Sequence, residues 1–310
     1  MYYPFLRGKK FELYSIENVN VNVFQNTLPI VEPVGAPTNA VANGSFKRLA
    51  VAKRPFILII NPQHGKISRA KVESHLLNGL LATHTGVSVG YIVVQTSTAA
   101  EVRTFLTSYP GRGKALIFRG NFTPVILDQI LIEVRMNVPD VIVFESSKTS
   151  TVTQNAFAWH PHRVLLTDGF HRASRNADYQ ALPDTAFEAD YSNYIANGWQ
   201  GIGDYQTVGD IFREKGGQPY VVTLHVTSNV VSGVQTNHYS SHSKSTIEGH
   251  APEKFTEALN KLVACPKITP LNSTGLDMYR DWHARGHFPQ LGAAKQASLQ
   301  HHFELMSSLV

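Results

Sequence analysis

Residues 114–120 read KALIFRG, and this stretch shows the pattern that decides the fold prediction. An apolar run typical of a buried strand ends in a single arginine, Arg119, and a segment with helical spacing follows it. The same order recurs along the first two-thirds of the chain. The polar residues that end the successive apolar runs are Arg7, Glu32, Asn61, Gln95, Arg119, Glu145, Asp168 and Asp204. The sequence therefore predicts eight strands with helices between them.

The apolar runs are continuous rather than alternating, as in FILII at 56–60 and VIVF at 141–144. Strands of this kind are buried on both faces and are typically parallel, because helical crossovers cover both sides of the sheet. Successive end residues lie about 30 positions apart, which is the length of one strand–helix unit. Eight such units favour an α/β fold, a (β/α)8 TIM-like barrel over residues 1–209. An open parallel sheet is the alternative, since the first and last strands are short.

The predicted elements follow from these runs and from the helix signals between them. The predicted strands cover residues 2–6, 28–34, 55–60, 87–94, 114–120, 140–144, 163–167 and 201–204. The predicted helices cover residues 11–19, 45–53, 68–83, 98–109, 125–136 and 184–196, and a Ser/Thr-rich helix start follows residue 145. Pro124 supports one of these helices, because proline is favoured at the first helical position.

The pattern changes after residue 209. Segments 220–227 and 234–241 alternate apolar and polar residues around a Ser-Gly turn, which predicts an antiparallel hairpin. Helices are predicted at 252–264, 274–284 and 291–309. We expect residues 210–310 to pack on the barrel as a C-terminal β-hairpin and helical extension, and not to form an independent domain.

Composition excludes several classes of protein. The chain has 310 residues, 43% of them hydrophobic and 16% charged, with a net charge of +5 and a pI near 9.2. This mild basic excess permits a phosphate-bearing partner but does not require one. The single cysteine, Cys265, excludes an intrachain disulfide and a Cys-rich metal site, and suits a cytoplasmic location. No apolar run approaches the roughly 20 residues of a membrane span, so we expect no membrane partner.

The ends of parallel barrel strands share one mouth, and the end residues there predict a polar site. Three cations, Arg7, Lys9 and Arg119, suit a phosphate or carboxylate, and Asn61 could add a hydrogen bond to the ligand. The catalytic candidates, which could exchange protons or hold Mg²⁺ or Mn²⁺, are Glu32, Glu145, Asp168 and Asp204. The alternative interpretation is a ring of salt bridges that closes the top of the barrel.

The loop after the seventh strand adds His171, Arg172, Arg175 and Asp178 as candidate ligand-binding residues. The loop is too polar for the core, and it fits either a lid over the mouth or a solvated surface loop. His160 and His162 precede that strand, so we expect them at the opposite end of the barrel in a structural role. The sequence contains no P-loop, no GxGxxG after a strand and no GxSxG elbow.

The opening segment YPFLRGKKFEL, residues 3–13, resembles the start of an uncharacterised bacterial family with a YPxLRGKxFEL-type N-terminus. Residues 168–179, with their Arg-Asn-x-Asp-Tyr ending, resemble it too, as do 201–209 continuing to 219–225, and 287–306. That family is similar to the phage "beta protein" family, which implies a TIM-barrel-like fold. The resemblance also implies genes near mobile elements and antiphage defence loci, often beside a small nuclease-like protein.

The resemblance implies no catalytic residues. Its motif positions coincide in part with the mouth candidates, since they include Arg7, Lys9, Glu12, Arg175, Asp178 and Asp204. The tripeptide His171-Arg172-Ala173 departs from the family, where we expect a more lysine-rich run.

Two functions from different classes stay open at this point. The first is a hydrolase or lyase that acts on a phosphate-containing small molecule or a nucleic acid, with or without Mg²⁺ or Mn²⁺. The second is a non-catalytic binding or scaffold subunit whose protein partner, encoded nearby, does the chemistry. The sequence does not decide whether the protein is an enzyme.

Overall fold

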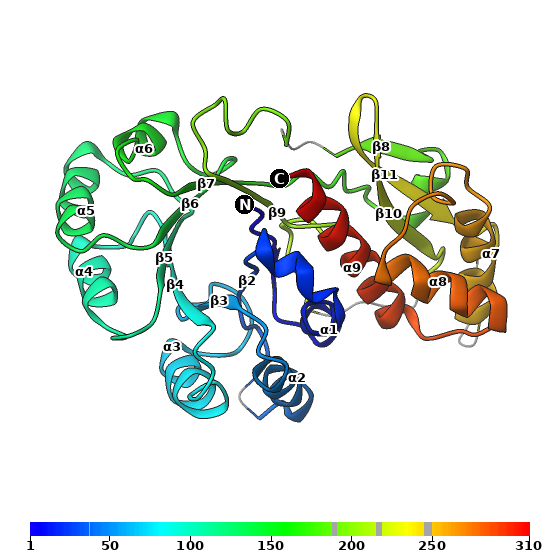
Figure 1. Cartoon of the computed structure of the whole chain (residues 1–310), viewed down its shortest axis with the longest axis horizontal. Helices are drawn as coiled ribbons and strands as arrows, with labels where there is room; N and C mark the ends of the chain where they lie inside the picture. Colours follow the sequence, from blue (N-terminus) through cyan, green and yellow to red (C-terminus); the bar gives the residue numbers. More distant parts are fainter. Residues whose placement is uncertain (37, 188–190, 215–218, 245–249) are drawn as a thin grey trace.

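Eight parallel strands form a nearly closed barrel in the computed structural model, which describes residues 1–36, 38–187, 191–214, 219–244 and 250–310 (Figure 1). The barrel strands are β1 (Phe5–Leu6), β2 (Ile30–Val31), β3 (Phe56–Ile59), β4 (Val87–Val93), β5 (Lys114–Phe118), β6 (Val141–Glu145), β7 (Arg163–Thr167) and β9 (Gly201–Asp204). They pair in chain order. Tyr2 bridges Ile202 of β9, and the Tyr3 amide donates to the Ile202 carbonyl at 2.8 Å. The predicted (β/α)8 TIM-like fold is confirmed.

The helices between these strands lie on the outside of the barrel (Figure 1). They are α1 (Lys10–Asn18), α2 (Ala40–Val51), α3 (Arg69–Lys71) continuing as a π-helix (Val72–Leu80), α4 (Ala99–Thr107), α5 (Pro124–Met136) and α6 (Thr151–Ala156), with 3₁₀ helices at Val21–Gln25 and Asn176–Gln180. Side chains cap several of them. Thr98 forms a capping box with Glu101, and Thr123 accepts from the Ile126 amide ahead of Pro124.

Strand residues alternate between two apolar layers. Phe5, Ile57, Ile117, Val143 and Leu166 belong to the cluster inside the barrel. Their neighbours along the strands pack against the surrounding helices. A polar residue two positions after an inner residue therefore points into the mouth, because side chains repeat with a period of two. This alternation decides which of the predicted end residues can meet.

One predicted element is wrong. The described residues of the predicted helix 184–196 are not helical, because β8 (Asp184–Ala186) is a strand of a separate antiparallel sheet and residues 191–198 form turns. Residues 188–190 lie outside the described part of the chain. Thr185 pairs with Thr236 of β11, so β8 covers an edge that the hairpin would otherwise leave open.

The extension contains the predicted hairpin and helices. The hairpin is β10 (Thr223–Val230) and β11 (Gly233–Ser240), and the helices are α7 (Ala251–Val263), α8 (Thr274–Arg285) and α9 (Leu291–Leu309). They share an apolar core of their own. Helix α9 lies between this core and the barrel, and it contacts α1, α8 and β10 (Figure 1). The small sheet takes β8 from within residues 1–209, so the two parts of the chain are interleaved.

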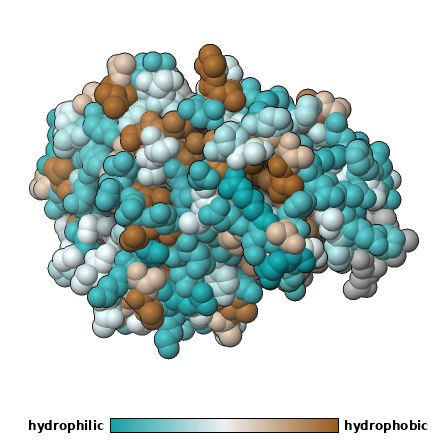
Figure 2. All heavy atoms as spheres, turned by 45° about the vertical axis from the view of Figure 1, so that its right-hand side comes forward, coloured by the Kyte–Doolittle hydropathy of each residue, from teal (hydrophilic) through white to brown (hydrophobic). Residues whose placement is uncertain are grey.

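The face in Figure 2 is mostly hydrophilic, and its apolar residues lie in separate small patches. Among the described residues, none of the helices combines the length and the apolar character that crossing a bilayer needs.

Candidate functional site

Two arginines point into the carboxyl-terminal mouth of the barrel, as predicted. Arg7 follows Phe5 by two positions and Arg119 follows Ile117 by two, so both side chains continue the inner layer. The Arg7 guanidinium lies 4.9 Å from the centre of the Phe5 ring, and that of Arg119 lies 5.8 Å from the same ring. A guanidinium is favoured over an aromatic face by cation–π attraction. The Phe5 ring inside the barrel thus packs against both guanidinium groups.

A carboxylate of the neighbouring strand pairs with each arginine. The Arg7 Nη1 donates to Glu32 Oε2 at 2.7 Å, and the Arg119 Nε donates to Glu145 Oε2. Lys148, on the turn after β6, contacts the second oxygen of Glu145 at 2.6 Å. Glu32 and Glu145 are buried, with 0% and 1% of their side chains exposed. Buried carboxylates of this kind require charged or hydrogen-bonding partners.

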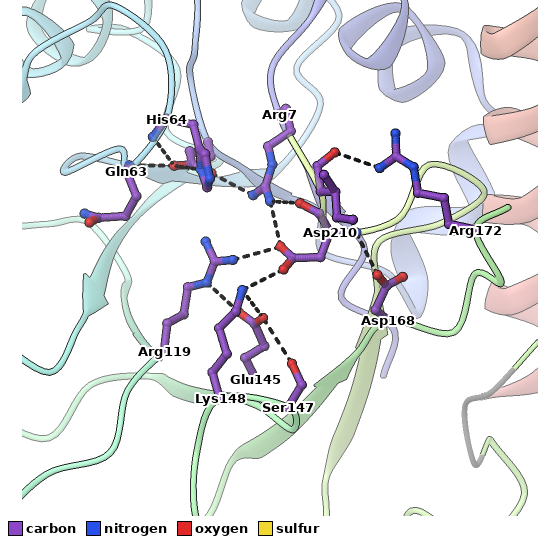
Figure 3. A network of polar contacts seen from close by, with 12 residues as sticks. Arg7, Gln63, His64, Arg119, Glu145, Ser147, Lys148, Asp168, Arg172 and Asp210 are labelled. Atoms are coloured by element: carbon purple, nitrogen blue, oxygen red, sulfur yellow. Dashed lines mark hydrogen bonds and ion pairs between the residues drawn. The ribbon is translucent and has the colours of Figure 1, made fainter. Parts of the chain in front are cut away.

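The three cations meet on a third carboxylate, Asp210, which lies on the loop after β9 (Figure 3). Arg7 Nη2 and Arg119 Nη2 each lie 2.8 Å from Asp210 Oδ1. The Lys148 Nζ lies 2.6 Å from Oδ2. Arg7 and Arg119 come from β1 and β5, which are four strands apart, so Asp210 connects opposite sides of the mouth. Three cations and three carboxylates form one network.

The segment after β3 adds further donors to Glu32. The Gln63 amide donates to Glu32 Oε1 at 2.6 Å and the His64 amide at 3.1 Å, and the His64 Nδ1 lies 3.2 Å from the same oxygen. Burial alone would raise the pKa of Glu32, but the His64 side chain, Arg7 and the Gln63 amide hold that pKa below its usual value. Glu32 is therefore an anion that fixes the orientation of Arg7.

Charge pairing also moves the pKa values of Arg119 and Asp210. Burial works against the charge on Arg119, but nearby Tyr205, Glu145 and Asp210 raise its pKa. Burial would raise the pKa of Asp210, whereas Lys148, Arg119 and Arg7 lower it. Both groups are therefore charged at neutral pH.

Asp168 has a different environment. It follows Leu166 of the inner layer by two positions, and its Oδ2 accepts the Asp210 amide at 2.9 Å (Figure 3). Loss of surrounding water raises the pKa of Asp168, and the carboxylates of Asp210 and Asp204 add to this, while two backbone amides act against it. A carboxyl group with a raised pKa at the edge of a mouth is a candidate for proton transfer.

Two other predicted ligand residues hold the loop that carries Asp210. The Lys9 ammonium donates to the Arg213 carbonyl and lies 4.9 Å from the centre of the Phe212 ring. The Arg172 Nη1 donates to the Ile211 carbonyl at 3.0 Å. Both side chains therefore bind the protein's own loop in this structure.

The remaining ligand candidates lie outside the mouth network. Asn61 bonds the Ile92 amide and carbonyl, at 2.8 Å each, and so extends the pairing of β3 with β4. Arg175 and Asp178 form an exposed pair at 2.8 Å within their own loop. The side chain of His171 is exposed. His160 lies at the opposite end of β7, where its Nε2 donates to the Pro139 carbonyl at 3.0 Å and its Nδ1 accepts the His162 amide at 3.1 Å, which fits the structural role expected for it.

The position expected for Asp204 is wrong. Asp204 follows Ile202, which belongs to the outer apolar layer, so its side chain points away from the mouth. It accepts the Tyr2 hydroxyl at 2.8 Å, the Tyr191 hydroxyl at 2.6 Å and the Gln206 amide at 2.7 Å. Its Oδ2 also lies 3.3 Å from His302 Nε2 on α9. Asp204 joins the barrel to the C-terminal helix.

Lys148 and Asp210 were not predicted from the sequence. Lys148 follows Glu145 by three residues, so its position was a usable signal once Glu145 was placed. Asp210 lies six residues beyond the last strand on an irregular loop, and no local pattern marks it.

The residues present do not fit the Mg²⁺ or Mn²⁺ site that the sequence suggested. Glu32 and Glu145 each pair with an arginine, and Asp204 lies in another layer. Within the described ranges, no three His, Cys, Asp or Glu side chains are placed so that they could share a metal ion.

Comparisons with known proteins add no family to this picture. No protein-family model matches the chain, and no curated protein matches its sequence. The resemblance to the bacterial family and to the phage "beta protein" family stays a prediction.

Proposed function

We propose that the barrel mouth binds the anionic group of a phosphate- or carboxylate-bearing ligand, and that Asp210 takes the place of this group in the structure. The observation that carries the proposal is the convergence of Arg7, Arg119 and Lys148 on the one carboxylate of Asp210. Two guanidinium groups and an ammonium group around one acceptor match the oxygens of a phosphate.

The three carboxylates of the network differ in how firmly they are held. Glu32 and Glu145 are part of barrel strands or directly follow them, and they are buried. Asp210 lies on a loop, and 21% of its side chain is exposed. A ligand could displace Asp210 by movement of that loop, while Glu32 and Glu145 keep the arginines in position. Loops can rearrange in this way at a cost far below that of moving a packed strand.

Asp168 supplies the chemistry of a hydrolase or lyase in this proposal. Its raised pKa suits a group that gives or takes a proton, and its contact with the Asp210 amide places it beside the anion site. The ligand class is a phosphate-containing small molecule or a nucleic acid. A cytoplasmic location and the antiphage defence setting of the resembled families belong to the same proposal.

The alternative is a non-catalytic binding or scaffold subunit that works with a separate nuclease-like protein. The mutual pairing of three cations with three carboxylates favours it, because such a network can stabilise the barrel without a ligand. Turnover of p-nitrophenyl phosphate or of bis(p-nitrophenyl) phosphate that Asp168→Asn abolishes would support the enzyme. Phosphate binding without turnover would support the binding subunit.

The test of the anion site is a comparison of phosphate binding in three forms of the protein. We expect Asp210→Ala to bind inorganic phosphate about tenfold more tightly than the wild type, as judged by the phosphate-dependent rise in Tm, because the variant leaves three cations without their carboxylate. Asp281→Ala is the matched control, since Asp281 is an exposed partner of Arg285 far from the mouth in the sequence. Equal phosphate responses in Asp210→Ala and Asp281→Ala would contradict the proposal.

A further inference from the structure

A cavity of about 380 Å³ lies beside the mouth, between the loop after β7, strand β10 and helix α9. Its volume lies within the range of about 300–1,000 Å³ that small-molecule sites span. None of the described residues of the mouth network lines it, although the loop 209–213 contributes to both places. Asp210 of this loop contacts the mouth cations, whereas Arg213 lines the cavity. The cavity is therefore distinct from the anion site proposed above.

The charged residues that line the cavity all have the same sign. They are Arg172, Arg175, Arg213 and Lys295, and the described lining contains no carboxylate. Two of them are already paired, because Arg175 contacts Asp178 and Lys295 contacts Glu12 at 2.6 Å. Within the described part of the chain, neither Arg172 nor Arg213 has an ion-pair partner. Both line the cavity without a direct ion pair among the described residues, and the charge of Asp168 acts on Arg172 from outside the lining.

The two guanidinium groups also affect each other. Burial lowers the pKa of Arg172 and the charge of Arg213 lowers it further, while Tyr179 and Asp168 act against them in part. Burial takes water away from a charge and like charges repel, so an anion between the two guanidinium groups would offset both effects. The cavity thus carries an electrostatic preference for an anion that the mouth does not explain.

The lining of the cavity also contains apolar and aromatic side chains. Phe170 and Tyr179 line it, together with Leu224 and Leu291. The His225 ring is edge-on to both aromatic rings, with its centre 5.1 Å from that of Phe170 and 4.8 Å from that of Tyr179. Burial lowers the pKa of His225 to about 3, so this ring is neutral and adds no charge to the cavity lining.

We propose that this cavity binds a small organic anion that has an aromatic or apolar body. The anionic group would lie between Arg172 and Arg213, and the body would pack against Phe170, Tyr179 and Leu291. Inorganic phosphate alone would gain only the first of these contacts. The proposed ligand is thus an anionic group joined to a ring. This proposal does not depend on the anion site at the mouth.

The test uses three probes that separate the two kinds of contact: phenyl phosphate, inorganic phosphate and benzyl alcohol. We expect isothermal titration calorimetry on the full chain to show phenyl phosphate binding at least tenfold more tightly than either of the other two. Arg213→Glu should weaken phenyl phosphate binding at least tenfold, because it replaces an attractive charge by a repulsive one. Leu291→Trp should weaken it by filling the cavity without changing the charge. Lys71→Glu is the matched control, since Lys71 is exposed on α3 and the same net charge is lost.

Three results would overturn the proposal. They are no binding of phenyl phosphate by the wild type, equal binding in Arg213→Glu and Lys71→Glu, and loss of binding in Arg119→Ala but not in Arg213→Glu. The last result would place the ligand in the mouth. Arg213 is exposed on a loop, so its replacement tests the proposal even where Leu291→Trp fails to fold.

Discussion

At the scale of single residues, Arg119 is the side chain on which the mouth network depends most. It is 5% exposed, and it contacts both Glu145 and Asp210. Glu145 is deeper still, so its carboxylate has little access to water as a substitute partner. The cost of losing Arg119 therefore comes mainly from the carboxylate that remains, because an uncompensated buried charge is strongly unfavourable.

We expect Arg119→Met to lower the free energy of unfolding by about 3 kcal/mol, the lower end of the range for a broken buried ion pair, since Lys148 still contacts Glu145. Urea unfolding at neutral pH measures this change. Arg285→Met is the control, because Arg285 forms an exposed pair with Asp281 and should cost less than about 1 kcal/mol. Losses of similar size in the two variants would show that the mouth network contributes no more than a surface pair.

The sequence predicted the four network residues that continue barrel strands, but it missed Lys148 and Asp210, which lie on loops. Arg7, Glu32, Arg119 and Glu145 follow inward-facing strand residues by two positions, so the strand period places them in the mouth. Asp204 follows an outward-facing residue, so the same period turns it away from the mouth, although the prediction assigned every strand-end residue to the mouth. Asp210 has no strand to fix its direction, and loop geometry alone brings it to the arginines.

At the scale of elements, the hairpin shows how a sheet can hold neutral histidines. His225 of β10 and His238 of β11 are paired across the ladder, and their Nδ1 atoms lie 2.8 Å apart. Burial and the neighbouring ring lower the pKa of His225 to about 3, and burial with the nearby His171 lowers that of His238 to about 4, against the pull of Asp184. Each histidine binds its proton in the unfolded chain near pH 6.5 but not in the folded one.

The unfolded chain therefore binds more protons than the folded one between pH 6.5 and about 4, so stability falls as the pH falls through this window. We expect the wild-type Tm to decrease steadily from pH 6.5 to 4.5. The double variant His225→Phe/His238→Phe should show a smaller decrease. Part of the pH dependence of Tm should persist in the double variant, because burial also lowers the pKa of His301 to about 4. Identical slopes in the two proteins would mean that the hairpin pair is not neutral in the folded state.

The element that the sequence misassigned belongs to the same sheet. Residues 184–196 have the length and spacing of a helix, yet Asp184–Ala186 pair with β11. The free edge of the hairpin decides their conformation, and that edge comes from a segment about 50 residues further along the chain. Local helix propensity does not predict strand pairing with a segment that far away, and tertiary pairing overrides the local propensity.

At the scale of the whole molecule, helix α9 is the element that joins the barrel to the extension. His301 and His302 are adjacent on this helix, and both are buried. The His301 Nε2 donates to the Thr227 carbonyl of β10 at 2.7 Å, while the His302 Nε2 lies 3.3 Å from Asp204 of β9. One turn of α9 therefore contacts the last strand of the barrel and the first strand of the hairpin.

Asp204 is the barrel's side of that contact, and its pKa makes the contact sensitive to acid. Burial alone would raise the pKa of Asp204, but His302, Tyr191 and the Gln206 amide hold it below its usual value of 3.8. The unfolded carboxylate takes up a proton near pH 3.8, whereas the folded one resists it. The stabilisation from ionised Asp204 is thus present above pH 3.8 and is lost as the pH falls through the folded pKa.

We expect Asp204→Asn to lower the free energy of unfolding at pH 7 by about 2–4 kcal/mol, because the amide presents one oxygen, where the carboxylate presents two, to the donors from Tyr2, Tyr191, Gln206 and His302. The difference from the wild type should shrink as the pH falls below 3.8, since the unfolded wild-type carboxyl then takes up a proton that the folded one resists. Urea unfolding from pH 7 to 3 measures both effects, with exposed Asp281→Asn as the control. A difference that stays constant from pH 7 to 3 would mean that the charge of Asp204 does not hold α9 against the barrel, and that neutral hydrogen bonds and packing do so instead.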